Sequence, residues 1–293
     1  MTNIKSQISH LQSALSAAYP EDEAHSLAWW IVEELTGKSR TELQFGCKDT
    51  AFSSIMQEKS QEIISRLLHF EPIQYIFGHT LWCGLDLLVT PATIIPRPET
   101  AELVERINKP TPTLPEGKAL NVLDVGTGSG CIAIALKKAH PSWSVTGIDI
   151  SPEAIAIARE NARRNKVEVN FQVADIFSDQ MTKYLNKWYV VNDQMVNIVV
   201  SNPPYICESE KTSMRPNVLN FEPSTALFVP DDDPLLFYRR IASLHWGKYL
   251  YFEINESYAS EISAMLSGLG YTDIQIHKDI YGKDRIIEAR MAR

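Results

Sequence analysis

The chain has 293 residues, of which 44% are hydrophobic and 22% are charged, a composition typical of globular proteins. Its formal net charge of −8 weighs against a protein that holds nucleic acid through the backbone phosphates. The sequence has no run of about 18 apolar residues that could cross a membrane.

The sequence also favours a reducing compartment. Its first residues lack the basic and apolar layout of a secretory signal, and its four cysteines are far apart, with no C-x-x-C pair. We therefore expect a cytoplasmic protein without disulfides. The seven histidines show no spacing typical of metal ligands, so no metal site is expected.

Residues 1–75 are predicted to form a small helical bundle, because apolar residues recur there at helical spacing. The expected inward faces are Ile4, Ile8, Leu11, Leu15 and Ala18 in the first helix, Ala24, Leu27, Ala28, Ile31, Val32 and Leu35 in the second, and Phe52, Ile55, Ile63, Ile64, Leu67 and Leu68 in the third. Gly37 is placed to end the second helix. Residues 1–90 hold 11 Asp and Glu against 6 Lys and Arg, so this end of the chain is acidic.

Residues 76–95 are predicted to form a β-hairpin that links two domains. Glycines at 78 and 84 separate short apolar and aromatic runs there, which is typical of a hairpin. Residues 96–293 form the second domain, and it contains a proline-rich surface loop at 109–118.

From residue 119, strand and helix patterns alternate, which predicts an α/β domain with a doubly wound, mostly parallel sheet. The expected strands are 119–125, 144–150, 169–177, 196–201, 248–254, 271–279 and 284–291, with helices at 131–139 and 152–165. The last two strands alternate in polarity and are expected to pair antiparallel.

A loop of alternating glycines, D-V-G-T-G-S-G at 124–130, follows the first of these strands. Glycine lets a backbone approach a ligand closely, and the helix behind the loop favours an anion at its N-terminus. Asp149 ends the second strand, where a carboxylate can accept hydrogen bonds from both ribose hydroxyls. Asp175 ends the third, within reach of an adenine amino group, with Ile176 and Phe177 beside the ring.

The spacing G-x-G-x-G differs from the dinucleotide fingerprint G-x-G-x-x-G and favours S-adenosylmethionine, whose product is S-adenosylhomocysteine. The expected cofactor-binding residues are Gly126, Thr127, Gly128, Ser129, Gly130, Asp149, Asp175, Ile176 and Asn202.

The fourth strand ends in Asn202-Pro203-Pro204-Tyr205. Two prolines after a strand can simply mark a turn. Here they also restrict the backbone, so the Asn202 side-chain oxygen and the Pro203 carbonyl would face the cofactor as two fixed acceptors. Such a pair suits an –NH₂ group, either an amide or the exocyclic amino group of a base, with Tyr205 packed on its flat face. The residues Asn202, Pro203, Pro204 and Tyr205 are therefore the expected catalytic and substrate-binding residues.

Several further motifs accompany N-P-P-Y. They are E-P-I-Q-Y-I-F-G-H (71–79), I-P-R-P-E-T (95–100), D-I-S (149–151) and F-E-P (221–223). Together with the glycine loop, they make the sequence resemble the bacterial release-factor glutamine N5-methyltransferases, the HemK or PrmC family. The chain departs from the family pattern at Ile176, at Ala101 and in the segment 253–259.

The resemblance implies a Rossmann-like class I S-adenosylmethionine-dependent methyltransferase domain. Its seven-stranded sheet is mostly parallel, with an antiparallel last strand. We expect residues 1–75 to recognise the release factor, because an acidic surface could recruit a basic face of that protein. The resemblance also implies the substrate, the glutamine of the Gly-Gly-Gln motif in class 1 peptide chain release factors, which is methylated at the side-chain nitrogen N5. Arg97 and Glu99 would border the substrate pocket. We expect a monomer with no direct nucleic-acid target.

Two alternatives remain open. An adenine N6 methyltransferase acting on DNA or RNA would share N-P-P-Y, but it usually needs a basic surface because the target base must be flipped out. A non-catalytic domain that binds ribosomal or termination factors would need neither the glycine loop nor N-P-P-Y.

Overall fold

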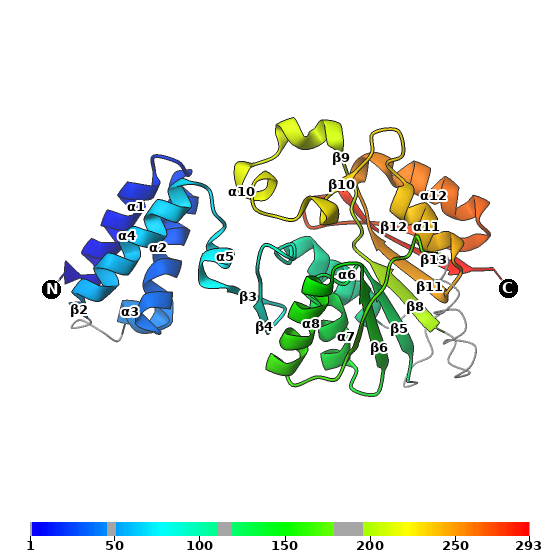
Figure 1. Ribbon diagram of the computed structural model, residues 1–293, viewed down its shortest axis with the longest axis horizontal. Helices are drawn as coiled ribbons and strands as arrows, with labels where there is room; N and C mark the ends of the chain where they lie inside the picture. Colours follow the sequence, from blue (N-terminus) through cyan, green and yellow to red (C-terminus); the bar gives the residue numbers. More distant parts are fainter. Residues whose placement is uncertain (1, 46–50, 110–118, 179–195, 293) are drawn as a thin grey trace. The chain divides into compact units, whose positions relative to one another are not determined.

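The computed structural model describes residues 2–45, 51–109, 119–178 and 196–292 (Figure 1). The chain divides into two compact units, Met1–Phe77 with Pro216–Phe221, and Gly78–Arg215 with Glu222–Arg293. The proposed three-part division at residues 75 and 95 stays a prediction. The loop expected at 109–118 lies, apart from Lys109, outside the described residues.

The first unit is a helical bundle. Its elements are β1 (Thr2–Asn3), α1 (Ile4–Leu15), α2 (Glu21–Thr36), α3 (Arg40–Phe45), β2 (Ala51–Phe52), α4 (Ser54–Leu68), α5 (Ile73–Phe77) and α10 (Pro216–Leu219). The predicted inward faces of α1 and α2 form its core, where Leu11, Leu15 and Ile31 are fully buried. Gly37 ends α2 as predicted, in a left-handed conformation with φ of 65°, and its N–H donates to the Glu33 carbonyl.

The prediction for the third helix was partly wrong. Phe52 belongs to β2, and α4 begins after Ser53, whose side chain accepts a hydrogen bond from the Met56 N–H. Ile63, Ile64 and Leu67 are buried as expected, but Ile55 is 65% exposed and Leu68 is 37% exposed. The short strand shifts the helix start, so Ile55 falls in its first turn, away from the core.

The second unit is built on a seven-stranded sheet in the order β12-β13-β11-β8-β5-β6-β7. Its strands are β5 (Asn121–Val125), β6 (Ser144–Asp149), β7 (Asn170–Val173), β8 (Val196–Ser201), β11 (Gly247–Glu253), β12 (Tyr271–Lys278) and β13 (Asp284–Met291). Strands β7, β6, β5, β8 and β11 are parallel, and β13 pairs antiparallel with both β11 and β12. The expected mostly parallel sheet with an antiparallel last strand is confirmed.

Helices cover both faces of this sheet (Figure 1). Helices α6 (Pro98–Asn108), α7 (Cys131–Ala139) and α8 (Pro152–Arg164) pack on one face, and α11 (Leu236–Ser243) and α12 (Ala259–Gly268) pack on the other. Alternate residues of one strand enter the two cores, as with Tyr251 and Phe252 of β11. Strands covered on both sides must be apolar on both sides, which explains the continuous apolar runs in the sequence.

Shorter elements complete the second unit. The hairpin of β3 (His79–Trp82) and β4 (Leu85–Leu88) packs Trp82, Leu85 and Leu87 into the core of this unit. The parallel pair β9 (Ile206–Cys207) and β10 (Phe228–Val229) and the short helices η1 (Glu208–Ser213), η2 (Ser224–Ala226) and η3 (Glu256–Tyr258) also belong to it. None of the helices in the described ranges has the length and apolarity needed to span a membrane.

The parallel strands bring their carboxyl ends to one edge of the sheet. Val125 of β5 is the register partner of Ser201 of β8, and the Ser201 hydroxyl donates to the Val125 carbonyl at 2.6 Å. On the other side of β5, Asp149 of β6 pairs with Val173 of β7. The segments that follow these four strands therefore meet at one place, where ligands of open α/β sheets bind.

One buried side chain ties the hairpin to this edge. Asn161 of α8 is fully buried, and its amide accepts from the Leu88 N–H at 2.6 Å and donates to the Leu88 carbonyl at 3.0 Å. The same amide nitrogen donates to the Ser129 carbonyl in the glycine loop at 2.9 Å. The Asn161 side chain thus supplies the hydrogen-bond partners of three backbone groups that have little access to water.

We expect Asn161→Ala to lower the free energy of unfolding by about 2–4 kcal/mol, because it leaves these backbone groups unpaired. Asn165→Ala is the matched control, since Asn165 also bonds the backbone of the hairpin, at Asp86, but in a more exposed position. The control substitution should lower the free energy of unfolding by no more than about 1 kcal/mol. Urea unfolding measures both, and equal losses would contradict the role assigned to Asn161.

Candidate active site

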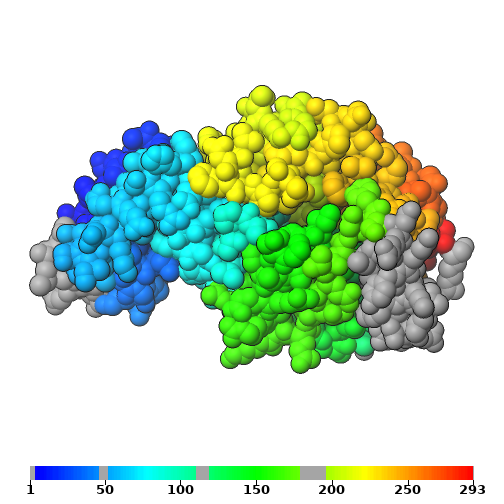
Figure 2. Space-filling model, in the orientation of Figure 1, coloured from blue at the N-terminus to red at the C-terminus, as the bar shows by residue number. Residues whose placement is uncertain are grey.

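A cavity of about 290 Å³ lies over the carboxyl ends of the parallel strands. Residues that follow β5, β6, β7 and β8 line it, together with residues 92–94 and residues of the 223–226 segment. In the space-filling view, the yellow segment that follows β8 borders the green segment that contains α8 (Figure 2). The predicted cofactor and substrate motifs thus share one cavity.

The glycine loop gives its backbone to this cavity. Gly126 and Gly128 line it, and a side chain at either position would meet open space rather than protein. Gly128 has a positive φ of 52°, which a residue with a Cβ adopts only with strain. Gly130 has another role, because a Cβ there would approach the Phe171 ring to 2.9 Å. The third glycine therefore lets the helix behind the loop pack closely.

Thr127, Ser129 and Gly130 do not line the cavity. The Thr127 hydroxyl donates to the buried Asp124 carboxylate at 2.6 Å, and the Ser129 carbonyl accepts from Asn161. The contacts of these residues stabilise the loop on the side away from the cavity. Their predicted contact with a cofactor stays a prediction.

Asp149 lines the cavity at the end of β6. Its two carboxylate oxygens accept from the Gly128 and Ser151 N–H groups, each at 2.9 Å. Burial raises the pKa of Asp149, and these backbone hydrogen bonds lower it. The carboxylate is held rigidly between the glycine loop and the start of α8.

Asp175, Ile176 and Phe177 follow β7 and line the cavity, and their predicted contact with an adenine ring stays a prediction. Asp175 accepts from the Phe177 N–H at 2.8 Å, which fixes the turn. The Phe177 ring meets Phe237 of α11 edge to face, with centroids 5.5 Å apart. This side of the cavity is thus apolar and aromatic, with one carboxylate, and a flat aromatic ring such as a base could stack there.

Asn202, Pro203 and Pro204 follow β8 and line the cavity. In the sheet, β8 and β6, the strand that ends in Asp149, lie on opposite sides of β5. The Asn202 side-chain nitrogen donates to the Thr100 hydroxyl at 3.2 Å. Its oxygen, Oδ1, has no hydrogen-bond donor among the described residues and can accept from a ligand. Thr100 was not singled out by the sequence as a site residue.

Tyr205 does not line the cavity. Its ring packs against the core beneath α11 and α12, and its hydroxyl donates to the Glu253 carboxylate at 3.1 Å. The predicted packing of Tyr205 on the substrate stays a prediction. The structure instead connects Tyr205 to a buried carboxylate that the sequence did not identify as functional.

Arg97 and Glu99 lie at the start of α6 and do not line the cavity. Arg97 forms an ion pair of 2.6 Å with Glu222, whose side chain is only 1% exposed. This contact joins two motifs that are far apart in sequence, I-P-R-P-E-T and F-E-P. Substrate binding by Arg97 and Glu99 remains a prediction.

The residues of the cavity fit S-adenosylmethionine. The two open glycines allow close approach, Asp149 offers acceptors beside them, and the aromatic side offers a place for a base. No cluster of His, Cys, Asp or Glu that could hold a metal ion occurs among the described residues.

Asp124 lies under the glycine loop and is fully buried. One oxygen accepts from Thr127 and from the Ala133 N–H, whereas Oδ1 is buried without a partner. Burial raises the pKa of Asp124 to about 7, against the lowering effect of these hydrogen bonds. Below about pH 7 the protonated form of Asp124 is therefore favoured in the folded state.

This pKa predicts a pH dependence of stability. Because the folded pKa is raised, the stability that Asp124 contributes is fully present below its unfolded pKa and is lost as pH rises through about 7. Asp124→Asn removes this titration. We expect the variant to gain about 2–3 kcal/mol of unfolding free energy relative to the wild type between pH 5 and pH 8.

Urea unfolding at both pH values measures this difference, with Asp232→Asn at an exposed position as the control. If the stabilities of the Asp124→Asn variant and the wild type change in parallel with pH, Asp124 is not the source of the pH dependence.

Comparisons with known proteins identify the family and the fold. A family model described as a methyltransferase domain matches residues 116–226, and the PrmC N-terminal domain model matches residues 7–78. A catalytic domain of hMettl16, solved with a MAT2A 3′UTR hairpin, is 13% identical with a TM-score of 0.53, covering 83% of this chain and 84% of that one. At that identity the likeness concerns the fold alone.

Relatives at higher identity match almost the whole chain. The release factor glutamine methyltransferase of Bacteroides thetaiotaomicron is 44% identical over 96% of this chain and 97% of its own length. The corresponding protein of Flavobacterium psychrophilum is 39% identical over 97% of this chain and 98% of its own. The chain therefore belongs to the release factor glutamine methyltransferase family.

Proposed function

We propose that this protein transfers a methyl group from S-adenosylmethionine to the side-chain nitrogen N5 of the glutamine in the Gly-Gly-Gln motif of class 1 peptide chain release factors. The observation that carries the chemistry is Asn202, whose oxygen is free to accept while its nitrogen is engaged by Thr100 beside the cavity. The substrate is supported by relatives that match nearly the full chain and bear the name of this activity.

The methyl donor supplies a good leaving group, so the protein's task is to bind and orient the acceptor. An amide nitrogen is a weak nucleophile because its lone pair is delocalised into the carbonyl. Asn202 Oδ1 and the Pro203 carbonyl would accept the two N–H groups of the glutamine amide and hold its nitrogen toward the cavity. Orientation of this kind can contribute about 7–11 kcal/mol to catalysis.

Gly126, Gly128, Asp149, Asp175 and Ile176 would bind the methyl donor in this proposal. Asp149 would accept the ribose hydroxyls, and the side formed by residues 175–177 would take the adenine. We place the reaction in the cytoplasm, with the protein as a monomer that acts on a protein and not on nucleic acid.

The N-terminal unit would recognise the release factor. Residues 1–90 carry 11 acidic against 6 basic residues, and such a surface attracts a basic partner by complementary charge. The methyltransferase unit alone would then bind the release factor less tightly.

The Asp149→Asn variant tests the cofactor site. In this variant the side-chain –NH₂ group replaces one of the two oxygens that accept from the Gly128 and Ser151 N–H groups. One of these hydrogen bonds is then lost, so we expect the Kd for S-adenosylmethionine to rise about 10-fold or more. Calorimetry measures it, with the exposed Asp273→Asn as control. An unchanged Kd would show that Asp149 does not contribute to binding of S-adenosylmethionine.

Mass spectrometry of a purified release factor, incubated with S-adenosylmethionine and the protein, tests the function. We expect one added methyl group on the Gly-Gly-Gln glutamine and none on a release factor in which that glutamine is replaced by asparagine. Asn202→Ala should lower the rate by about 100- to 1,000-fold with cofactor binding kept, because one acceptor of the amide is lost.

The exposed Asn170→Ala is the control and should keep the wild-type rate. Transfer to DNA or RNA but not to the release factor would favour the adenine alternative. A protein that binds no S-adenosylmethionine would favour a non-catalytic role.

A further inference from the structure

The amide of Asn202 can lie in two orientations, and only one offers its oxygen to a substrate. In the structure its nitrogen donates to the Thr100 hydroxyl at 3.2 Å, and the oxygen is left for a ligand. Rotation by a half turn would present the nitrogen to the cavity and repel an incoming –NH₂ group. Something in the protein must therefore distinguish the two orientations.

Thr100 has the means to do so, because a hydroxyl carries a single hydrogen. That hydrogen is donated to Glu253 Oε2 at 2.7 Å. Only the lone pairs of the hydroxyl then remain for Asn202, and lone pairs accept from the amide nitrogen but not from the amide oxygen. The direction of the Thr100 hydrogen bond thus decides the orientation of Asn202.

Glu253, in turn, decides the direction of the Thr100 bond. It ends β11, is 1% exposed, and its other oxygen accepts from the Tyr205 hydroxyl at 3.1 Å. Its two oxygens therefore accept from two different hydroxyls, those of Thr100 and Tyr205. Neither Thr100 nor Glu253 lines the cavity, so Thr100 acts on the ligand through Asn202, and Glu253 acts on Asn202 through Thr100.

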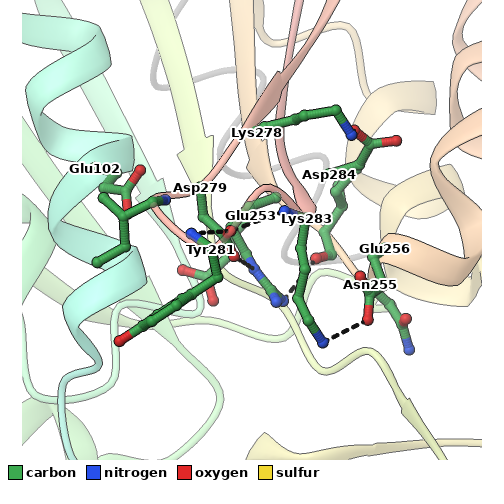
Figure 3. A network of polar contacts seen from close by, with 12 residues as sticks. Glu102, Glu253, Asn255, Glu256, Lys278, Asp279, Tyr281, Lys283 and Asp284 are labelled. Carbon is green, nitrogen blue, oxygen red and sulfur yellow. Dashed lines mark hydrogen bonds and ion pairs between the residues drawn. The ribbon is translucent and has the colours of Figure 1, made fainter.

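The pKa of the Glu253 carboxyl is raised above its ordinary value, chiefly by burial. The Thr100 and Tyr205 hydrogen bonds and the positive charge of Arg285 act in the opposite direction and lower this pKa. Arg285 is fixed by the fully buried Asp279 carboxylate at 3.2 Å and donates to the Ile254 carbonyl. Figure 3 shows Asp279 and Glu253 in one network of polar contacts.

We propose that Glu253 and Thr100 are positioning residues that hold the Asn202 amide with its oxygen toward the substrate, and so select an amino group as the methyl acceptor. The proposal rests on the proposed function, in which Asn202 accepts from the glutamine amide. It adds two residues, 153 positions apart, that act on the reaction through a single relay.

Thr100→Val tests the relay, because valine keeps the shape of threonine and removes the hydroxyl. We expect kcat for methylation of the release factor to fall about 10- to 100-fold, because the variant loses the hydrogen bond that orients the Asn202 amide toward the substrate. KM for the release factor and Kd for S-adenosylmethionine should stay at wild-type values. Thr100→Ser restores the hydroxyl and should recover most of the lost kcat.

Thr80→Val is the matched control, since Thr80 is also buried in this unit but lies in the hairpin. It should keep the wild-type kcat. If Thr100→Val retains the wild-type kcat, or if Thr100→Ser is as slow as Thr100→Val, the proposal is overturned.

A double-mutant cycle tests whether Glu253 acts through Thr100. Glu253→Gln places a donor where one of the two hydroxyls needs an acceptor, so we expect it to lower kcat by a similar factor. On the Thr100→Val background it should add little further loss, because the relay is already broken. Multiplicative losses would overturn the relay.

Calorimetric binding of S-adenosylmethionine and the melting temperature show that each variant is folded. The wild type separates the two hypotheses. If it fails to methylate the release factor, the proposed function fails, and the inference with it. If the wild type is active and the variants are unaffected, only the inference fails.

Discussion

The site depends on the register between β5 and β8. Because Val125 and Ser201 are partners and are joined by the Ser201 hydroxyl, the glycine loop and the N-P-P-Y segment leave the sheet side by side. A slip of one residue would turn the side chains of a strand to the other face and separate the two motifs. Both apolar cores, which lie on opposite faces of these strands, hold this register. The chemistry at the edge is therefore secured by packing within the sheet.

Much of this architecture could be predicted from local pattern. The glycine loop, the carboxylates after successive strands and the rigid Asn202-Pro203 pair each lie within a few residues of a strong strand signal, and the resemblance to the family joined them. Helices α11 and α12 were not predicted, although Tyr238, Ile241 and Ala242 of α11 are buried at helical spacing. Their segments are short and lie between strands with much stronger patterns.

The supporting contacts of the site could not be predicted in this way. Thr100 and Glu253 are 153 positions apart, and Arg97 and Glu222 are 125 apart, so no local pattern reports that they meet. The hydrogen bond from the Tyr205 hydroxyl to Glu253 likewise joins residues that are 48 positions apart. Such pairings follow from the three-dimensional fold and become visible only once the strands are in order.

The Asn161 amide also bears on how the methyltransferase unit can open locally. One side chain bonds both the hairpin strand β4 and the Ser129 carbonyl of the glycine loop. Movement of either segment away from Asn161 would leave buried polar groups unpaired, which costs free energy. The hairpin and the glycine loop therefore share one buried side chain as a source of local stability.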